Sequence, residues 1–163
     1  MLARTRSAAT VTLSAVLALG GLGALGCGPP SPETGERPSP HHEGHVHAAP
    51  HGGLLVELAH EAAYLEVVFD RATGGLTLFV LGAHADTPVR ISAPALDVHL
   101  EVDGATFTLS LDAVGSPLTG ETPGDSSEFT ADDPRLVTSG RIEGRIPRID
   151  VRGVVFDDVR FEL

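Results

Sequence analysis

The sequence is poor in residues that would cross-link or stiffen a small fold. Only one of its 163 residues is Cys, which excludes an internal disulfide even in an oxidising compartment. Trp is absent, and the large aromatic side chains are one Tyr and six Phe. The core therefore has to be built mainly from Leu, Val, Ile and Ala, and stability has to come from their packing.

Basic residues are also scarce. Lys is absent, and 11 Arg stand against 22 acidic residues, which gives a formal net charge of −11 at pH 7. Without residues 1–26, which hold two Arg and no acidic residue, nine Arg remain against 22 acids and the charge is −13. Because phosphate binding needs a basic face, nucleic acid is not expected as a partner. Adsorption to anionic lipid is disfavoured for the same reason.

Short catalytic motifs are missing as well. The chain has no Gly-x-Ser-x-Gly, no His-Glu-x-x-His and no phosphate-binding loop. Two acidic pairs, Asp132-Asp133 and Asp157-Asp158, would point to opposite faces if they lay on strands. Asp132 fits a helix cap, and the second pair fits a turn or a charged strand edge. We therefore do not expect an enzyme.

The first 26 residues have the pattern of an export signal. Arg4 and Arg6 precede an apolar stretch that runs to Gly26 without an acidic residue. The following Ala24-Leu25-Gly26-Cys27 resembles the lipobox of bacterial lipoproteins, in which the Cys carries the lipid. An ordinary secretory signal and a retained membrane helix are the alternatives. We expect a lipoprotein signal peptide at 1–26 and lipid attachment at Cys27.

Residues 27–52 predict a disordered tether. They are rich in Pro, Gly and His and show no apolar periodicity, so they cannot bury enough surface to offset the entropy of ordering. A flexible segment of this length spans about 25 to 30 Å. Because Gly28 rather than Asp follows Cys27, we expect the protein to be anchored at the outer membrane and to face the periplasm.

From residue 53 to residue 163, short apolar segments alternate with turn residues, as in an all-β domain. The Pro at residue 88 places one of the expected strands at a sheet edge. The predicted fold is an antiparallel, Ig-like β-sandwich of seven to nine short strands. We expect strands over residues 53–58, 63–70, 76–81, 88–93, 96–102, 105–111, 127–130, 142–151 and 154–163.

The clearest strand pattern lies at residues 96–111. Apolar and polar residues alternate on both sides of Asp103-Gly104, a dipeptide that favours a two-residue type I′ hairpin turn. The resulting register pairs Leu100 with Phe107 and places His99 on the solvent face. One face of this hairpin is therefore expected in the core.

Five of the eight His residues fall within eleven positions: His41, His42, His45, His47 and His51. Imidazole binds Zn, Cu(II) and Ni, whereas soft Cu(I) prefers the thiolates and thioethers that are nearly absent here. The tract therefore predicts a site for a divalent transition metal. The alternative is a solvated spacer selected only for disorder.

A second group of metal ligands is predicted within the domain. If a hairpin that pairs Phe69 with Leu76 continued regularly, Glu61 would lie opposite His84, with His60 next to it. His60, Glu61 and His84 would then meet at one end of the sheet. The alternative is that they are loop residues without a shared role.

Three segments resemble a known group of proteins: His51-Gly52-Gly53-Leu54-Leu55-Val56-Glu57-Leu58, residues 64–70 with 76–81, and residues 120–129. They are similar to a family of small exported bacterial proteins, resembling lipoproteins, found beside heavy-metal efflux systems. Related His-Gly-Gly segments occur in some of the periplasmic adaptor subunits of those systems. The resemblance implies an exported β-rich domain associated with metal traffic, with His51 as a ligand candidate. The adaptor coiled-coil hairpin is absent, so efflux-adaptor function does not transfer.

Two hypotheses of function follow. The first is a lipid-anchored cell-envelope protein that binds Zn, Cu(II) or Ni through its His-rich tether, as a metal buffer or an accessory to metal efflux. The second is an interaction module without metal, in which the acidic sandwich on its tether binds another envelope protein through a sheet face or edge. The expected partners are the membrane, through the N-terminal lipid, and a metal-efflux or other envelope protein.

Overall fold

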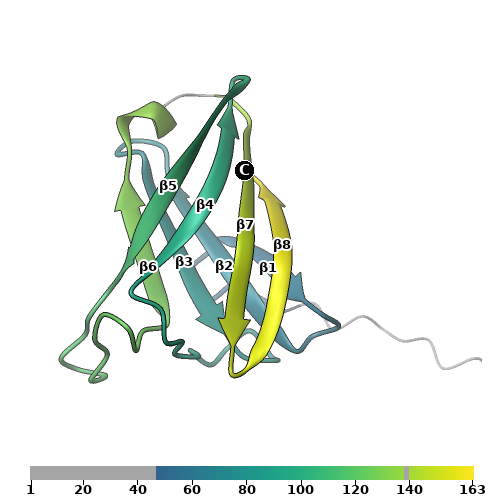
Figure 1. Cartoon of the computed structure of the whole chain (residues 1–163), viewed down its shortest axis with the longest axis vertical. Helices are drawn as coiled ribbons and strands as arrows, with labels where there is room; N and C mark the ends of the chain where they lie inside the picture. The colour runs from purple at the N-terminus through teal and green to yellow at the C-terminus, as the bar shows by residue number, and fades with distance from the viewer. Residues whose placement is uncertain (1–46, 138–139) are drawn as a thin grey trace, which may run out of the picture. The chain divides into compact units, whose positions relative to one another are not determined.

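A computed structural model describes residues 47–137 and 140–163 (Figure 1). The signal peptide, Cys27 and most of the predicted tether lie outside the described residues. The predicted all-β fold with antiparallel strands is confirmed. Within the described ranges, no helix is long and apolar enough to cross a bilayer. The elements are β1 (Leu54–Leu58), β2 (Ala63–Asp70), β3 (Gly75–Leu81), β4 (Ala95–Val102), β5 (Ala105–Ala113), β6 (Glu128–Asp132), a short 3-10 helix η1 (Pro134–Leu136), β7 (Ile142–Val151) and β8 (Val154–Glu162).

All eight strands belong to one continuous sheet, in the order β1-β2-β3-β6-β5-β4-β7-β8. Every neighbouring pair is antiparallel. The sheet curls so that β1, β2, β3 and β6 lie across the core from β4, β5, β7 and β8 (Figure 1), and β1 comes close to β8. The two layers expected of a sandwich are therefore the two halves of one hydrogen-bonded sheet.

The predicted hairpin registers are confirmed. Leu100 pairs with Phe107, and Phe69 pairs with Leu76. Asp103 and Gly104 have φ angles of 51° and 80°, and a type I′ turn requires positive values at both positions.

Residues 88–93 do not form the predicted edge strand. Two isolated bridges take its place, one between Leu81 and Pro88 and one between Ile91 and Ser126. Pro88 has no amide hydrogen to donate to a ladder, which limits regular pairing here. Val89 and Ile91 are nevertheless buried, so the apolar pattern identified a core segment rather than a strand.

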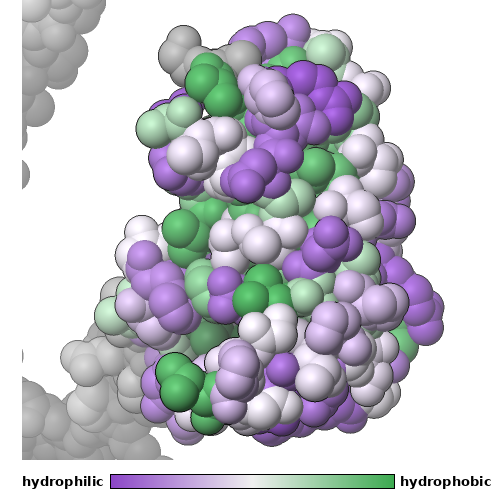
Figure 2. All heavy atoms as spheres, turned by 90° about the vertical axis from the view of Figure 1, so that its left-hand side faces the viewer, coloured by the Kyte–Doolittle hydropathy of each residue, from purple (hydrophilic) through white to green (hydrophobic). Residues whose placement is uncertain are grey.

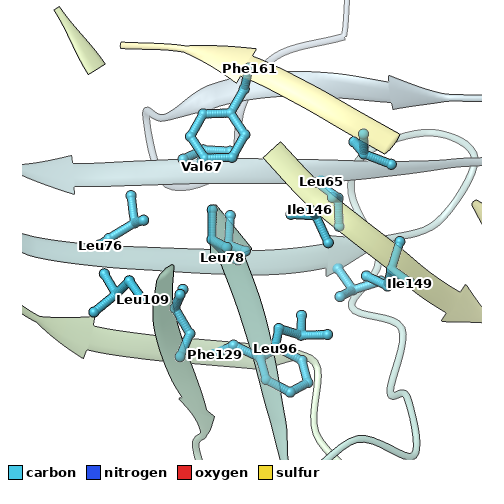
Figure 3. Close-up of a cluster of buried hydrophobic side chains, with 14 of the residues drawn as sticks. Leu65, Val67, Leu76, Leu78, Leu96, Leu109, Phe129, Ile146, Ile149 and Phe161 are labelled. Carbon is cyan, nitrogen blue, oxygen red and sulfur yellow. The ribbon is translucent and has the colours of Figure 1, made fainter. Parts of the chain in front are cut away.

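The core lies between the two halves of the curled sheet (Figure 3). Inward side chains of β2 and β3, such as Leu65 and Leu78, meet those of β7 and β8, such as Ile146 and Phe161. Phe129 of β6 is fully buried among them. On the β5–β6 side of the surface, hydrophobic residues form small groups among hydrophilic ones (Figure 2).

Strands β7 and β8 change phase together between the pairs Ile146–Val159 and Arg148–Asp157, so that the alternation of buried and exposed residues shifts by one in each strand. Phe156 and Val159 both point inward, so Asp157 and Asp158 between them are both exposed. Asp158 allows this by taking a left-handed φ of 58°. The expectation that this acidic pair points to opposite faces is therefore wrong. Both carboxylates pair with guanidinium groups, those of Arg145, Arg148 and Arg160.

The short helix η1 begins at Pro134, and its cap is Asp133 rather than the predicted Asp132. The Asp133 carboxylate accepts a hydrogen bond from the backbone N–H of Arg135. Pro134 occupies the first turn, where a missing amide hydrogen has no cost.

Candidate metal-binding site

The segment just before β1 lies on the outer face of β1, β2 and β3. The His51 ring stacks on Phe79, with ring centroids 3.7 Å apart and an interplanar angle of 11°. The His47 ring lies 5.1 Å from that of Tyr64. Packing thus begins six residues before the domain boundary predicted at residue 53. The last part of the predicted tether belongs to the folded unit because these rings cover an apolar outer face.

A buried carboxylate holds this segment in place. The Glu66 side chain projects from the outer face of β2 and is fully buried. Its Oε1 accepts hydrogen bonds from the backbone N–H of His51 at 2.7 Å and of Gly53 at 2.9 Å. Its Oε2 lies 2.8 Å from Nδ1 of His51. Three donors therefore compensate a charge that would be costly to bury alone.

The protonation of Glu66 follows from the same contacts. Burial alone would raise the pKa of the Glu66 carboxyl. The hydrogen bonds from Gly53 and His51, together with the charge of a protonated His51, outweigh burial and lower this pKa below its ordinary value. Glu66 is consequently ionised at neutral pH.

Two glycines allow the segment to approach β2 so closely. Gly52 has a φ of 75°, a conformation that side chains other than Gly rarely adopt. A Cβ on Gly53 would lie 2.5 Å from the carbonyl oxygen of Val67. The His51-Gly52-Gly53 segment therefore has a structural role in addition to any role in metal binding.

His51 presents one ring nitrogen to Glu66 and leaves the other outside this contact. Its side chain is 43% exposed although Nδ1 is engaged. A carboxylate bound to one imidazole nitrogen is the usual way in which proteins orient the second nitrogen toward a metal. His51 is thus suited to bind an ion through Nε2.

His47 is the second candidate ligand. Its Nε2 is buried and has no hydrogen-bond partner among the described residues. The His84 ring lies next to it, with centroids 6.2 Å apart and an interplanar angle of 46°. Burial, followed by the charges of Glu61 and Glu57, raises the pKa of Tyr64 on the other side. Tyr64 is therefore a neutral ring that packs against His47 and does not act as a phenolate ligand.

No protein family, curated protein or solved structure matches this chain. Its function has to be inferred from its own residues.

The predicted group of His60, Glu61 and His84 does not form a three-ligand cluster. The β2–β3 ladder ends at Tyr64 and Leu81, before it could bring Glu61 opposite His84. Residues 59–61 instead form a turn in which all three φ angles are positive. Among residues 47–137 and 140–163, no group of three or more His, Cys, Asp or Glu side chains is arranged to hold a metal ion. His84 lies beside His47 instead.

The remaining predicted histidines fall into two groups. His41, His42 and His45 lie outside the described residues, so their part in metal binding stays a prediction. His99 is exposed on β4 opposite Thr108, as the hairpin register predicts.

Glu66 belongs to the candidate site but is not among the residues predicted from the sequence. A signal was present, because Glu66 is the one charged residue in the apolar run from Ala63 to Phe69. An acid at such a position is almost never buried without a partner. The nearby His-Gly-Gly segment supplies backbone N–H groups and an imidazole, so it was a candidate partner for this carboxylate.

Proposed function

We propose that the protein is a lipid-anchored protein of the cell envelope that binds a divalent transition metal. The ligands are the histidines of residues 41–51, and the protein acts as a metal buffer or as an accessory to metal efflux. The observation that carries this proposal is the buried, unpartnered Nε2 of His47 beside the ring of His84. A nitrogen removed from water without a partner is costly, and a bound ion would satisfy it.

The donor set supports Zn, Cu(II) or Ni. Imidazole nitrogens are borderline ligands that suit these ions. Soft Cu(I) would be favoured by thiolates or thioethers, but after residue 1 the chain has no Met, and its one Cys is the expected lipid site. The net charge of −11 also favours a cation over an anion as ligand.

The location at the membrane rests on the export pattern that ends at Cys27. If Cys27 carries the lipid, Cys27→Ala releases the protein from the membrane fraction into the soluble fraction of the envelope. Cell fractionation followed by immunoblotting measures this. Membrane association that survives Cys27→Ala would contradict a lipid anchor at this residue.

Metal content of the full chain tests the proposal. The protein is purified from cells grown with added zinc, and bound Zn, Cu and Ni are measured by mass spectrometry. We expect at least one equivalent in the wild type and almost none when His41, His42, His45, His47 and His51 are changed to Ala. The control variant has Ala in place of two exposed histidines outside the tract, His60 and His99, and it should keep its metal. Equal, substoichiometric metal in all three proteins would overturn the proposal.

A second function, as a metal-free interaction module, is favoured by the two sheet edges. β1 and β8 end the sheet, so each has one edge without a strand partner among residues 47–137 and 140–163. Between them lies a groove of about 430 Å³, lined by Val56–Ala59 and Val155–Arg160. A strand of another envelope protein could add to either edge.

Substitutions in this groove separate the two functions. An interaction module predicts that Val155→Glu abolishes capture of an envelope partner, while the five-histidine variant keeps it. Val137→Glu is the control, because Val137 is exposed outside the groove. The metal-binding proposal predicts the reverse. The five-histidine variant should lose its metal, whereas Val155→Glu should keep it.

A further inference from the structure

Two histidines that are distant in sequence lie side by side on the outer face of the β1–β3 half of the sheet. His47 precedes β1, and His84 lies in the loop that follows β3. Their ring centroids are 6.2 Å apart. The sequence pattern does not predict this pair. It assigns His47 to the tract and His84 to a separate second group of ligands.

The spacing of the two rings fits a shared ion. A nitrogen ligand lies about 2 Å from a zinc ion, so two imidazoles on one ion have ring centroids roughly 5 Å apart at a tetrahedral angle and about 6.5 Å apart when they are trans. The observed separation lies between these two values. Binding would therefore need the side chains to rotate, and a tetrahedral ion would also draw the two rings closer together.

The backbone on both sides of the pair is already held. The loop that carries His84 is closed by backbone hydrogen bonds from Gly82 to Thr87 and from Ala85 to Gly82. The segment that carries His47 is fixed by the contacts of His51 and Gly53 with Glu66. Ligands that are positioned before binding lose little entropy when the ion arrives.

The local charge favours a cation. Glu57 and Glu61 lie close enough to Tyr64 to raise the pKa of its phenol, and Tyr64 packs directly against His47. The buried Nε2 of His47 has no competing partner in the described part of the chain. Both features favour the metal-bound over the metal-free state of the pair.

We propose that His47 and His84 bind one divalent transition-metal ion together, with solvent at the remaining coordination positions. This inference rests on the proposed metal-binding function, but it places a site on the folded domain rather than in the tract alone. The ion would fasten the segment before β1 to the loop after β3. Metal binding would then decide how firmly residues 47–50 are held against the sheet.

The test isolates the pair within the full chain. His41, His42 and His45 are changed to Ala, and His51 is kept because its contact with Glu66 holds the segment. Cu(II) is titrated into this background variant, and the number of coordinating nitrogens is read from the superhyperfine splitting in the EPR spectrum. We expect one ion with two imidazole nitrogens.

Single substitutions in this background identify the two ligands. His47→Phe keeps a ring against Tyr64 but removes the nitrogens, and His84→Ala removes the second ring. Each should weaken Cu(II) binding at least tenfold, as ligand loss should cost no less than loss of an outer-shell partner. His60→Ala, a change of an exposed histidine in the turn between β1 and β2, should leave the affinity unchanged.

Hydrogen exchange supplies an independent measurement. Zinc should slow amide exchange in residues 47–49, which precede the part of the segment held by Glu66, at least tenfold in the background variant, and should have no such effect once His84 is Ala. If the wild type binds no metal at all, the proposed function fails together with this inference. If the wild type binds metal but His47→Phe and His84→Ala bind as tightly as the background, the shared site is refuted while the tract remains.

Discussion

Glu66 shows how one ionised side chain can hold a segment that carries little apolar surface. Its carboxylate accepts from two backbone amides and contacts one imidazole, all within 2.9 Å. The donors come from two residues, His51 and Gly53, which a single Gly separates. An otherwise polar stretch is thereby brought onto the sheet, and His51 and His47 are brought with it.

The lowered pKa of Glu66 makes stability depend on pH. Because the pKa is lower in the folded state than the value near 4.3 in the unfolded chain, this contribution is complete above the unfolded value and is lost as the pH falls through the folded value. We expect Glu66→Gln to lower the free energy of unfolding by about 2 kcal/mol at pH 7. Urea unfolding from pH 7 to pH 3 measures the difference from wild type, which should shrink as the pH falls. A difference that is constant with pH would rule out this role of the charge.

Gly53 provides a steric test of the same contact. Gly53→Ala would drive its Cβ against the Val67 carbonyl oxygen at 2.5 Å, so the segment must move away from β2. We expect faster proteolysis between residues 47 and 53. Glu66 should also become exposed to solvent, because the segment that covers its carboxylate has moved away. Gly82→Ala is the control, because its Cβ would meet ordinary contacts at 3.6 Å and beyond. Equal proteolysis of the two variants would show that close approach of the segment is unnecessary.

At the scale of elements, the pairing of β7 with β8 depends on a glycine under an aromatic ring. Gly144 pairs with Phe161, and a Cβ on Gly144 would lie 2.1 Å from Cζ of the Phe161 ring. The ring therefore takes the space that a side chain on β7 would fill. Phe161 is buried as a result, although it lies on an edge strand.

This arrangement predicts a coupled pair of substitutions. Gly144→Ala should lower the free energy of unfolding by about 2 kcal/mol, because the Phe161 ring has to be displaced from its place in the core. In a Phe161→Leu background, the same Gly144→Ala change should cost much less. Chemical denaturation of the four proteins gives the coupling energy. Additive effects would mean that the ring and the glycine do not compete for space.

Elements defined by neighbours in sequence were predictable, and those that depend on distant pairing were not. The Asp103-Gly104 hairpin was predicted with its register because the turn residues and the alternation agree locally. Residues 88–93 have the composition of a strand but lack a regular partner. The phase change at Asp158 was missed because it requires a left-handed φ at a residue other than Gly, which the alternation pattern does not indicate.

At the scale of the whole molecule, the two halves of the sheet are joined where β5 pairs with β6. Each half is itself completed by a long-range pair, β3 with β6 or β4 with β7, and no local pattern specifies these pairs. The sequence therefore predicted layers of antiparallel strands but not their union in one curled sheet. The same limit applies to the site, because His47 and His84 become neighbours only when the segment before β1 is packed beside the loop after β3.

Metal binding to the folded chain should also raise its thermal stability. An ion that binds the native state at 100 times its dissociation constant contributes about 2.7 kcal/mol. For a domain of this size that corresponds to an increase in Tm of roughly 10 °C. Calorimetric melting with zinc and with a chelator measures the change, and magnesium serves as the control ion. An identical Tm in all three conditions would argue against binding to the folded state.

Isothermal titration of zinc into the full chain at neutral pH is the decisive measurement. If imidazoles of the tract and the domain hold the ion, the wild type gives a saturable heat with at least one equivalent bound. The variant without His41, His42, His45, His47 and His51 then gives almost none. A wild-type titration indistinguishable from that variant would contradict metal binding by these histidines.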